Sequence, residues 1–106
     1  MTSNWLYLAL AIAMEIIATS ALKESAGLRR WGPAAISLAG YVVAFAALAK
    51  ALRTIPLGVA YAIWSGTGIA VLTLVGVLVY RDTMGLAQGA GIALIGAGIA
   101  LVYLAR

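Results

Sequence analysis

The stretch that decides the fold runs from residue 54 to residue 80 and reads TIPLGVAYAIWSGTGIAVLTLVGVLVY, 27 residues without a charged side chain. A helix needs about 20 apolar residues to cross the hydrocarbon core of a bilayer, so this stretch is long enough to span a membrane. Two further charge-free stretches cover residues 31–49 and 83–105, and a fourth, residues 5–22, is interrupted only by Glu15. The sequence therefore predicts four membrane-spanning segments.

These segments are expected to be helices rather than strands of a membrane barrel. The apolar runs are about twice as long as a barrel strand, and polar and apolar residues do not alternate along them. Short connections favour antiparallel neighbours in the chain. The expected fold class is an all-α membrane protein with one four-helix domain over residues 1–106. In chain order, the expected spans are about 5–22, 31–49, 56–80 and 84–105.

The composition agrees with a membrane protein and excludes several functions. The 106 residues are 65% hydrophobic and 9% charged, whereas a soluble domain carries about 25% charged residues. Because the sequence has no Cys and no His, a thiol nucleophile, a disulfide, a zinc or haem site and an imidazole proton relay are excluded. We expect no enzyme activity and no cofactor.

The net charge of +4 comes from basic residues that lie between the apolar runs or at their ends. Such positions meet lipid headgroups, so membrane lipids and not nucleic acid are the expected partners. Lys and Arg usually accumulate on cytoplasmic loops, yet three of them fall on one side of this membrane protein and four on the other. One hypothesis is that both orientations occur in the same membrane.

A single copy of this chain encloses little space for a transport pathway. Larger transporters build their pathway from two inverted repeats that face each other across the midplane. Two copies of this chain in opposite orientations would supply the two halves. We therefore expect an antiparallel homodimer.

Glu15 is the only charged residue inside the four expected spans. A charge at the centre of a span costs roughly 2.5–3.5 kcal/mol, and such residues usually face a cavity or the interior of a bundle. Lys23 is eight residues away, about 12 Å along a helix, which is too far for an ion pair. A proton or a bound cation remains as the means of neutralising the carboxylate. The alternative is a Glu15 that stays protonated and only links helices by a hydrogen bond.

Small and polar neighbours and several deep aromatic rings complete the candidate site. Helical spacing places six residues on the face of Glu15, namely Leu8, Ala11, Ile12, Ala18, Thr19 and Leu22. Among them Ala11, Ile12, Ala18 and Thr19 are the candidate substrate-binding residues. Buried Tyr and Trp side chains need polar partners, and aromatic faces attract organic cations. Four aromatic residues lie away from the span ends, namely Tyr41, Phe45, Tyr61 and Trp64. Phe45 can equally be apolar filler.

Glycines mark two further features of the later spans. Gly66 and Gly68 weaken the helix in the third span, and we interpret them as a conformational hinge. In the fourth span, small residues seven apart permit close contact between helices, so we expect Gly91, Leu94 and Gly98 to form the dimer contact.

At these residues the chain resembles the small multidrug resistance family over essentially its whole length. The resemblance comprises the segment from Glu15 to Thr19, the pair Tyr41 and Phe45, the run from residue 55 to residue 68, and the glycines of the fourth span. It implies an antiparallel, dual-topology homodimer in the bacterial cytoplasmic membrane. It also implies that two copies of Glu15 bind either protons or a cationic substrate, with Tyr61 and Trp64 at the site.

Within that family, the run Trp64-Ser65-Gly66 resembles the drug-exporting branch. Guanidinium exporters tend to have Thr at the position of Ser65 and Trp at the position of Ala18. The expected function is therefore a proton-coupled antiporter that exports hydrophobic or aromatic organic cations such as quaternary ammonium compounds, and Ser65 is counted among the substrate-binding residues. One alternative is a guanidinium exporter of the same fold. Another is a non-transporting partner subunit of a membrane complex.

Overall fold

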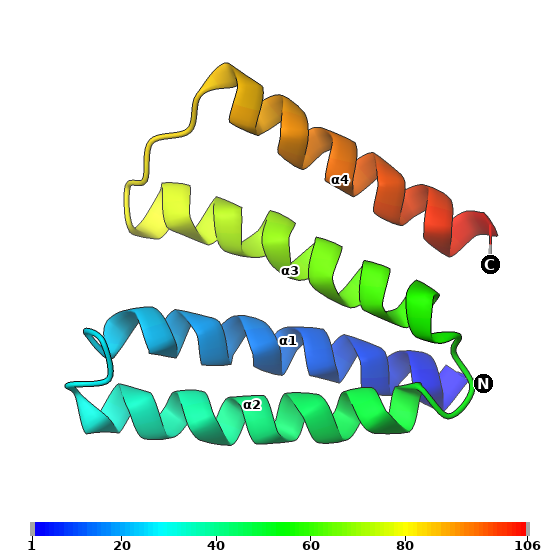
Figure 1. Ribbon diagram of the computed structural model, residues 1–106, viewed down its shortest axis with the longest axis horizontal. Helices are drawn as coiled ribbons and strands as arrows, with labels where there is room; N and C mark the ends of the chain where they lie inside the picture. The colour runs from blue at the N-terminus through cyan, green and yellow to red at the C-terminus, as the bar shows by residue number, and fades with distance from the viewer. Residues whose placement is uncertain (1, 106) are drawn as a thin grey trace. The chain divides into compact units, whose positions relative to one another are not determined.

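A computed structural model describes residues 2–105 of the chain, and every regular element in that range is a helix. The helices follow in the order α1 (Thr2–Glu24), α2 (Trp31–Ala51), α3 (Leu57–Val79) and α4 (Leu86–Ala105) (Figure 1). Each has 20 to 23 residues and is apolar enough to cross a membrane. The prediction of an all-α chain with four helices that can span a membrane is therefore confirmed.

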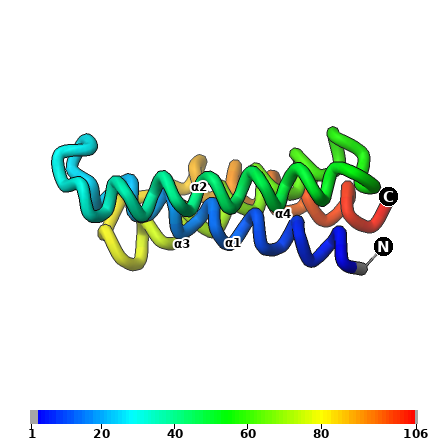
Figure 2. The backbone as a smooth tube through the Cα atoms, turned by 90° about the horizontal axis from the view of Figure 1, so that it is seen from below, coloured from blue at the N-terminus to red at the C-terminus, as the bar shows by residue number. Residues whose placement is uncertain are grey.

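The helices form two compact hairpins, α1 with α2 and α3 with α4. In the first hairpin, α1 and α2 lie side by side along their length in both views of the backbone (Figures 1 and 2). Small residues make this close approach possible. A Cβ atom added at Gly40 of α2 would lie 2.9 Å from the Cβ atom of Ala18 on α1, closer than two such atoms normally come.

Ser25 organises the turn between α1 and α2. It is fully buried, and its hydroxyl group donates a hydrogen bond to the carbonyl oxygen of Leu22 at 2.6 Å and accepts one from the backbone N–H of Leu28 at 3.1 Å. The backbone passes through the left-handed region at the next three residues, where Gly27 has a φ of 73°. Glycine adopts that conformation without steric cost, so the chain reverses within six residues.

Pro33 lies in the first turn of α2, which begins at Trp31 after the N-cap residue Arg30. The first backbone N–H groups of a helix have no partner within the helix, so a proline there removes a donor that would be unpaired in any case. Pro33 is therefore compatible with the start of α2 and does not interrupt the helix.

The second hairpin turns through residues 80–85, between the end of α3 at Val79 and the start of α4 at Leu86. Arg81 has a φ of 58°, and the backbone N–H of Asp82 donates to the carbonyl oxygen of Gly76 at 2.9 Å, which closes the end of α3. Gln88 then defines the beginning of α4, because its side-chain oxygen accepts a hydrogen bond from the backbone N–H of Gly85 at 2.8 Å. This is one half of a capping box, in which the third residue of a helix reaches back to the residue before its first turn.

Candidate functional site

Glu15 lies in the middle of α1, and its two carboxylate oxygens differ in their surroundings. Oε1 accepts a hydrogen bond from the hydroxyl group of Thr19, one turn further along the helix, at 3.0 Å. Oε2 is buried and has no hydrogen-bond partner among the residues that the structure describes. A buried acceptor without a partner is costly, so this oxygen is the part of the site that a proton or a cation can stabilise.

Tyr41 connects α2 to this carboxylate through Thr19. The hydroxyl oxygens of Thr19 and Tyr41 lie 2.5 Å apart. Phe45 follows one turn later on α2 and stacks on Tyr41, with ring centroids 6.2 Å apart and ring planes 23° from parallel. The first hairpin thus brings together four of the predicted site residues, Glu15, Thr19, Tyr41 and Phe45. They supply a carboxylate, two hydroxyl groups and a pair of stacked rings.

The remaining predicted residues of α1 lie within four residues of Glu15 in the sequence. Ala11 and Ala18 are fully buried, and Ile12 is partly buried. Ala18 packs against Gly40, a residue that sequence reasoning missed. The sequence feature that could have identified it is a glycine next to a tyrosine in the middle of an apolar span. Glycine weakens a helix, so a glycine at such a position indicates a packing role.

The second hairpin carries the other two deep aromatic residues. The rings of Tyr61 and Trp64 on α3 are in contact, with centroids 5.4 Å apart and an angle of 58° between their planes. The hydroxyl group of Ser65 donates to the carbonyl oxygen of Tyr61 at 2.6 Å. Since a serine has one hydroxyl proton, which Ser65 uses within the helix, its oxygen remains available to a ligand only as an acceptor.

Gly66 and Gly68 are buried in α3, which continues without interruption from Leu57 to Val79. At Gly66 the structure shows a close contact with α4, because an added Cβ atom would lie 2.6 Å from both Cγ1 and Cδ1 of Ile99. Gly66 therefore has a packing role in this hairpin. The hinge remains a prediction for both glycines.

The predicted dimer residues lie on an open helix. Among the twenty residues of α4, all of which the structure describes, none is buried. Leu94 is 73% exposed, and Cβ atoms added at Gly91 or Gly98 would meet nothing within 4 Å. α4 thus leaves the surface that carries these three residues uncovered.

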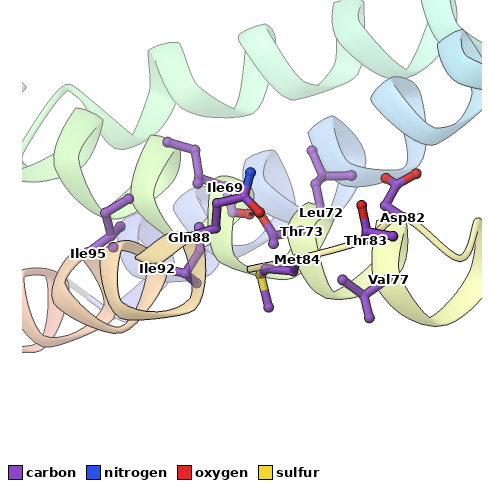
Figure 3. A pocket seen from close by; sticks show the side chains of 11 residues that line it. Ile69, Leu72, Thr73, Val77, Asp82, Thr83, Met84, Gln88, Ile92 and Ile95 are labelled. Atoms are coloured by element: carbon purple, nitrogen blue, oxygen red, sulfur yellow. Dashed lines mark hydrogen bonds between the residues drawn. The ribbon is translucent and has the colours of Figure 1, made fainter. Parts of the chain in front are cut away.

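A groove of about 670 Å³ lies between α3 and α4, near the turn that joins them (Figure 3). Most of its lining is apolar, and Asp82, Thr83, Thr73 and Gln88 provide its polar atoms (Figure 3). Of the residues predicted for the site, all of which are described, only Gly91 lines this groove. Tyr61 and Trp64 are not among the residues that line this groove.

Comparison with known proteins gives one consistent result. Residues 3–95 match the family model described as Small Multidrug Resistance protein. The chain is 46% identical over 102 residues to a multidrug transporter of Pseudomonas aeruginosa, and the match covers 96% of this chain and 93% of that relative. It is 41% identical over 101 residues to the quaternary ammonium compound-resistance protein QacE of Escherichia coli, covering 95% of this chain and 92% of QacE. It is 35% identical over 102 residues to the multidrug resistance protein EbrA of Bacillus subtilis, covering 96% of this chain and 97% of EbrA.

Proposed function

Because this chain belongs to the small multidrug resistance family, we propose that it is a proton-coupled antiporter that exports hydrophobic organic cations, quaternary ammonium compounds in particular. Relatives that share more than 40% of its residues are named for resistance to quaternary ammonium compounds and ethidium. Both are positively charged, and ethidium is aromatic. A carboxylate among aromatic rings has the chemistry to bind such ions.

The observation that carries the proposal is the unequal surroundings of the two Glu15 oxygens. Thr19 holds Oε1, while Oε2 is buried without a hydrogen-bond partner among the described residues. A proton on Oε2 or an organic cation beside it would neutralise the carboxylate. The two compete, because once Glu15 is protonated it no longer offers a negative charge to the substrate. Exchange of protons for substrate requires that the two compete for one group in this way.

The aromatic residues bind the apolar part of the substrate in this proposal. Each ring face contributes about 0.5–2 kcal/mol to the binding of a desolvated cation. Tyr61 and Trp64 already form a contacting pair on α3, and Phe45 extends the ring surface of α2 beside Tyr41. We assign the lone pairs of Ser65 to the same site, together with the small or apolar side chains of α1, which are Ala11, Ile12 and Ala18.

We further propose that two copies form an antiparallel homodimer through α4. The nearly balanced basic residues on the two sides of the membrane support insertion in both orientations. The exposed surface at Gly91, Leu94 and Gly98 supports a contact with a second copy, since small residues allow helices in a membrane to approach closely. Two Glu15 carboxylates then serve one transport pathway.

Exposure of this pathway alternates between the two sides of the membrane, with bending of α3 at Gly66 and Gly68 as the proposed hinge. We place the dimer in the bacterial cytoplasmic membrane, where inward proton movement drives outward export. The membrane potential supplies about 2.3 kcal/mol per charge for each 100 mV.

Substrate-induced currents in proteoliposomes test this function and separate it from its alternatives. We expect a bulky aromatic quaternary ammonium ion to produce a current under a proton gradient, and guanidinium to produce at least tenfold less. A larger current with guanidinium would replace this proposal with a guanidinium exporter. The absence of both a current and a change in internal pH with either ion, from protein shown to be folded, would favour a partner subunit and overturn the proposal.

A further inference from the structure

Three polar side chains form a continuous link from α2 to the carboxylate on α1. Tyr41 contacts Thr19 at 2.5 Å, and Thr19 contacts Oε1 of Glu15 at 3.0 Å. We propose that Thr19 is a positioning residue, and that through it the charge on Glu15 determines how firmly Tyr41 is held against α1. This inference rests on the proposed function in one respect, namely that Glu15 exchanges a proton during transport.

The number of hydroxyl protons sets the direction of the link when Glu15 is charged. A threonine hydroxyl group has one proton to donate, and an ionised carboxylate only accepts. Thr19 must therefore donate to Oε1 of Glu15. Its proton is then used, so the contact with Tyr41 is a hydrogen bond only if Tyr41 donates to Thr19. The bond to Glu15 is charge-assisted in this state, and such bonds are roughly twice as strong as neutral ones.

Protonation of Glu15 removes this constraint. A proton on Oε1 turns the carboxyl group into a donor, so Thr19 would accept from Glu15 and donate to Tyr41. A proton on Oε2 leaves Oε1 as a neutral and weaker acceptor. In both cases the charge assistance is lost, and in the first case the direction of both hydrogen bonds reverses. The hydrogen bond between Tyr41 and Thr19 therefore differs in strength between the proton-bound and proton-free states of Glu15.

The other ionisable groups of the first hairpin lie away from this link. On α1 they are Tyr7, Lys23 and Glu24, each at least eight residues from Glu15, and on α2 Lys50 accompanies Tyr41. Lys50 lies over the ring of Tyr7, with its Nζ atom 5.2 Å from the ring centroid, near the opposite end of α1 from Lys23. Glu24 forms an exposed ion pair with Arg30 of the turn at 3.8 Å. Within α1 and α2, Tyr41 is thus the ionisable group that is linked to Glu15.

The packing of the two helices keeps this link short. Ala18 and Gly40 are the residues directly before Thr19 and Tyr41, and their close contact brings the two backbones together beside the hydroxyl groups. Tyr41 in turn stacks on Phe45. A change in the hydrogen bond of Tyr41 would therefore affect the stacked rings of Tyr41 and Phe45, which we assign to substrate binding.

The test is a pH titration by NMR of the protein in lipid bilayers, with ¹³C labels at Cζ of tyrosine and Cδ of glutamate. We expect the Tyr41 signal to move with the same midpoint as the Glu15 carboxyl signal in the natural sequence. In Thr19→Val, which removes the hydroxyl group but keeps the branched shape, the Tyr41 shift should lose most of its amplitude. Thr19→Ser should restore it. Tyr7 and Tyr103 are internal controls whose signals should not follow Glu15.

The outcomes separate this inference from the proposed function. If Glu15 titrates and Tyr41 does not respond, or if Tyr41 responds equally in Thr19→Val, the role of Thr19 is wrong while proton exchange at Glu15 stands. If Glu15 itself does not titrate, both proposals fail. Should Thr19→Val not fold, Thr19→Ala provides the same comparison, because its smaller side chain occupies space that Thr19 already fills.

Discussion

Gly40 on α2 faces Ala18 on α1 so closely that a Cβ atom at Gly40 would lie 2.9 Å from the Ala18 Cβ atom and 3.3 Å from its Cα atom. The next residue on each helix carries a hydroxyl group, and these two groups, on Thr19 and Tyr41, are in hydrogen-bond contact. The contact of two small residues thus determines the position of the polar residues beside Glu15.

Gly40→Val should push α1 and α2 apart at the level of Glu15. A larger side chain in a tightly packed contact costs about 1–3 kcal/mol. We expect lower stability toward denaturant in detergent, together with at least a tenfold weaker affinity for a quaternary ammonium ion, measured by calorimetry. The affinity falls because the link between Tyr41 and Thr19 is broken.

Gly32→Val is the matched control for this prediction. Gly32 lies on the same helix, and an added Cβ atom there would meet nothing within 4 Å. This variant should bind the ion as the natural sequence does. Equal binding by the Gly40 and Gly32 variants would show that the contact with Ala18 does not position the site.

Gly66→Val should disturb the second hairpin through Ile99, whose Cγ1 and Cδ1 atoms lie 2.6 Å from the position of an added Cβ atom. We expect Ile99→Ala to relieve part of this cost, with a coupling between the two substitutions of about 0.5–3 kcal/mol in unfolding measurements. The double variant also separates packing from bending. If Gly66 acts as a hinge, transport stays low in the double variant even though its stability recovers, whereas recovery of both assigns the glycine to packing alone.

Gln88→Ala should loosen the start of α4, since it removes the acceptor for the backbone N–H of Gly85. The loss of a cap costs about 1 kcal/mol, so the amide of Gly85 should exchange with solvent roughly fivefold faster. Gln88→Glu keeps an acceptor at the same place and should keep slow exchange. Unchanged exchange in Gln88→Ala would mean that the cap does not contribute in the membrane.

Thr83→Lys combined with Met84→Lys should bias insertion into the membrane. Both residues are exposed in the turn between α3 and α4, and two added cations favour a cytoplasmic location for that turn. A reporter fused to the C-terminus should change from a mixed signal to a predominantly external one. The pair Thr83→Gln and Met84→Gln should leave the mixed signal unchanged. A one-sided signal that is the same in all three proteins would contradict dual topology.

The four helices and the isolated acid were predictable because they depend on residues that are close to one another in the sequence. The length of an apolar run decides whether it can cross a bilayer, and a lone Glu15 within such a run is visible without any structure. The contact between Thr19 and Glu15 follows from their spacing of four residues, which places them on one face of a helix.

Contacts between helices were not predictable in the same way. A helix that is apolar all round shows no polar face from which its packing surface can be read. The pairing of Ala18 with Gly40, and of Gly66 with Ile99, therefore required the structure. The cap at Gln88 was missed for a different reason, because the charge-free run of residues 83–105 gave no indication that α4 begins only at Leu86.

Uptake of a radiolabelled aromatic quaternary ammonium ion into acid-loaded proteoliposomes tests the role of Glu15 most directly. The natural sequence should accumulate the ion in exchange for internal protons, and Glu15→Gln should show no uptake driven by the proton gradient. Glu24→Gln and Asp82→Asn, which remove the other two acidic side chains of the chain, should accumulate the ion at close to the natural rate. Proton-driven uptake by Glu15→Gln at the natural rate would contradict the account.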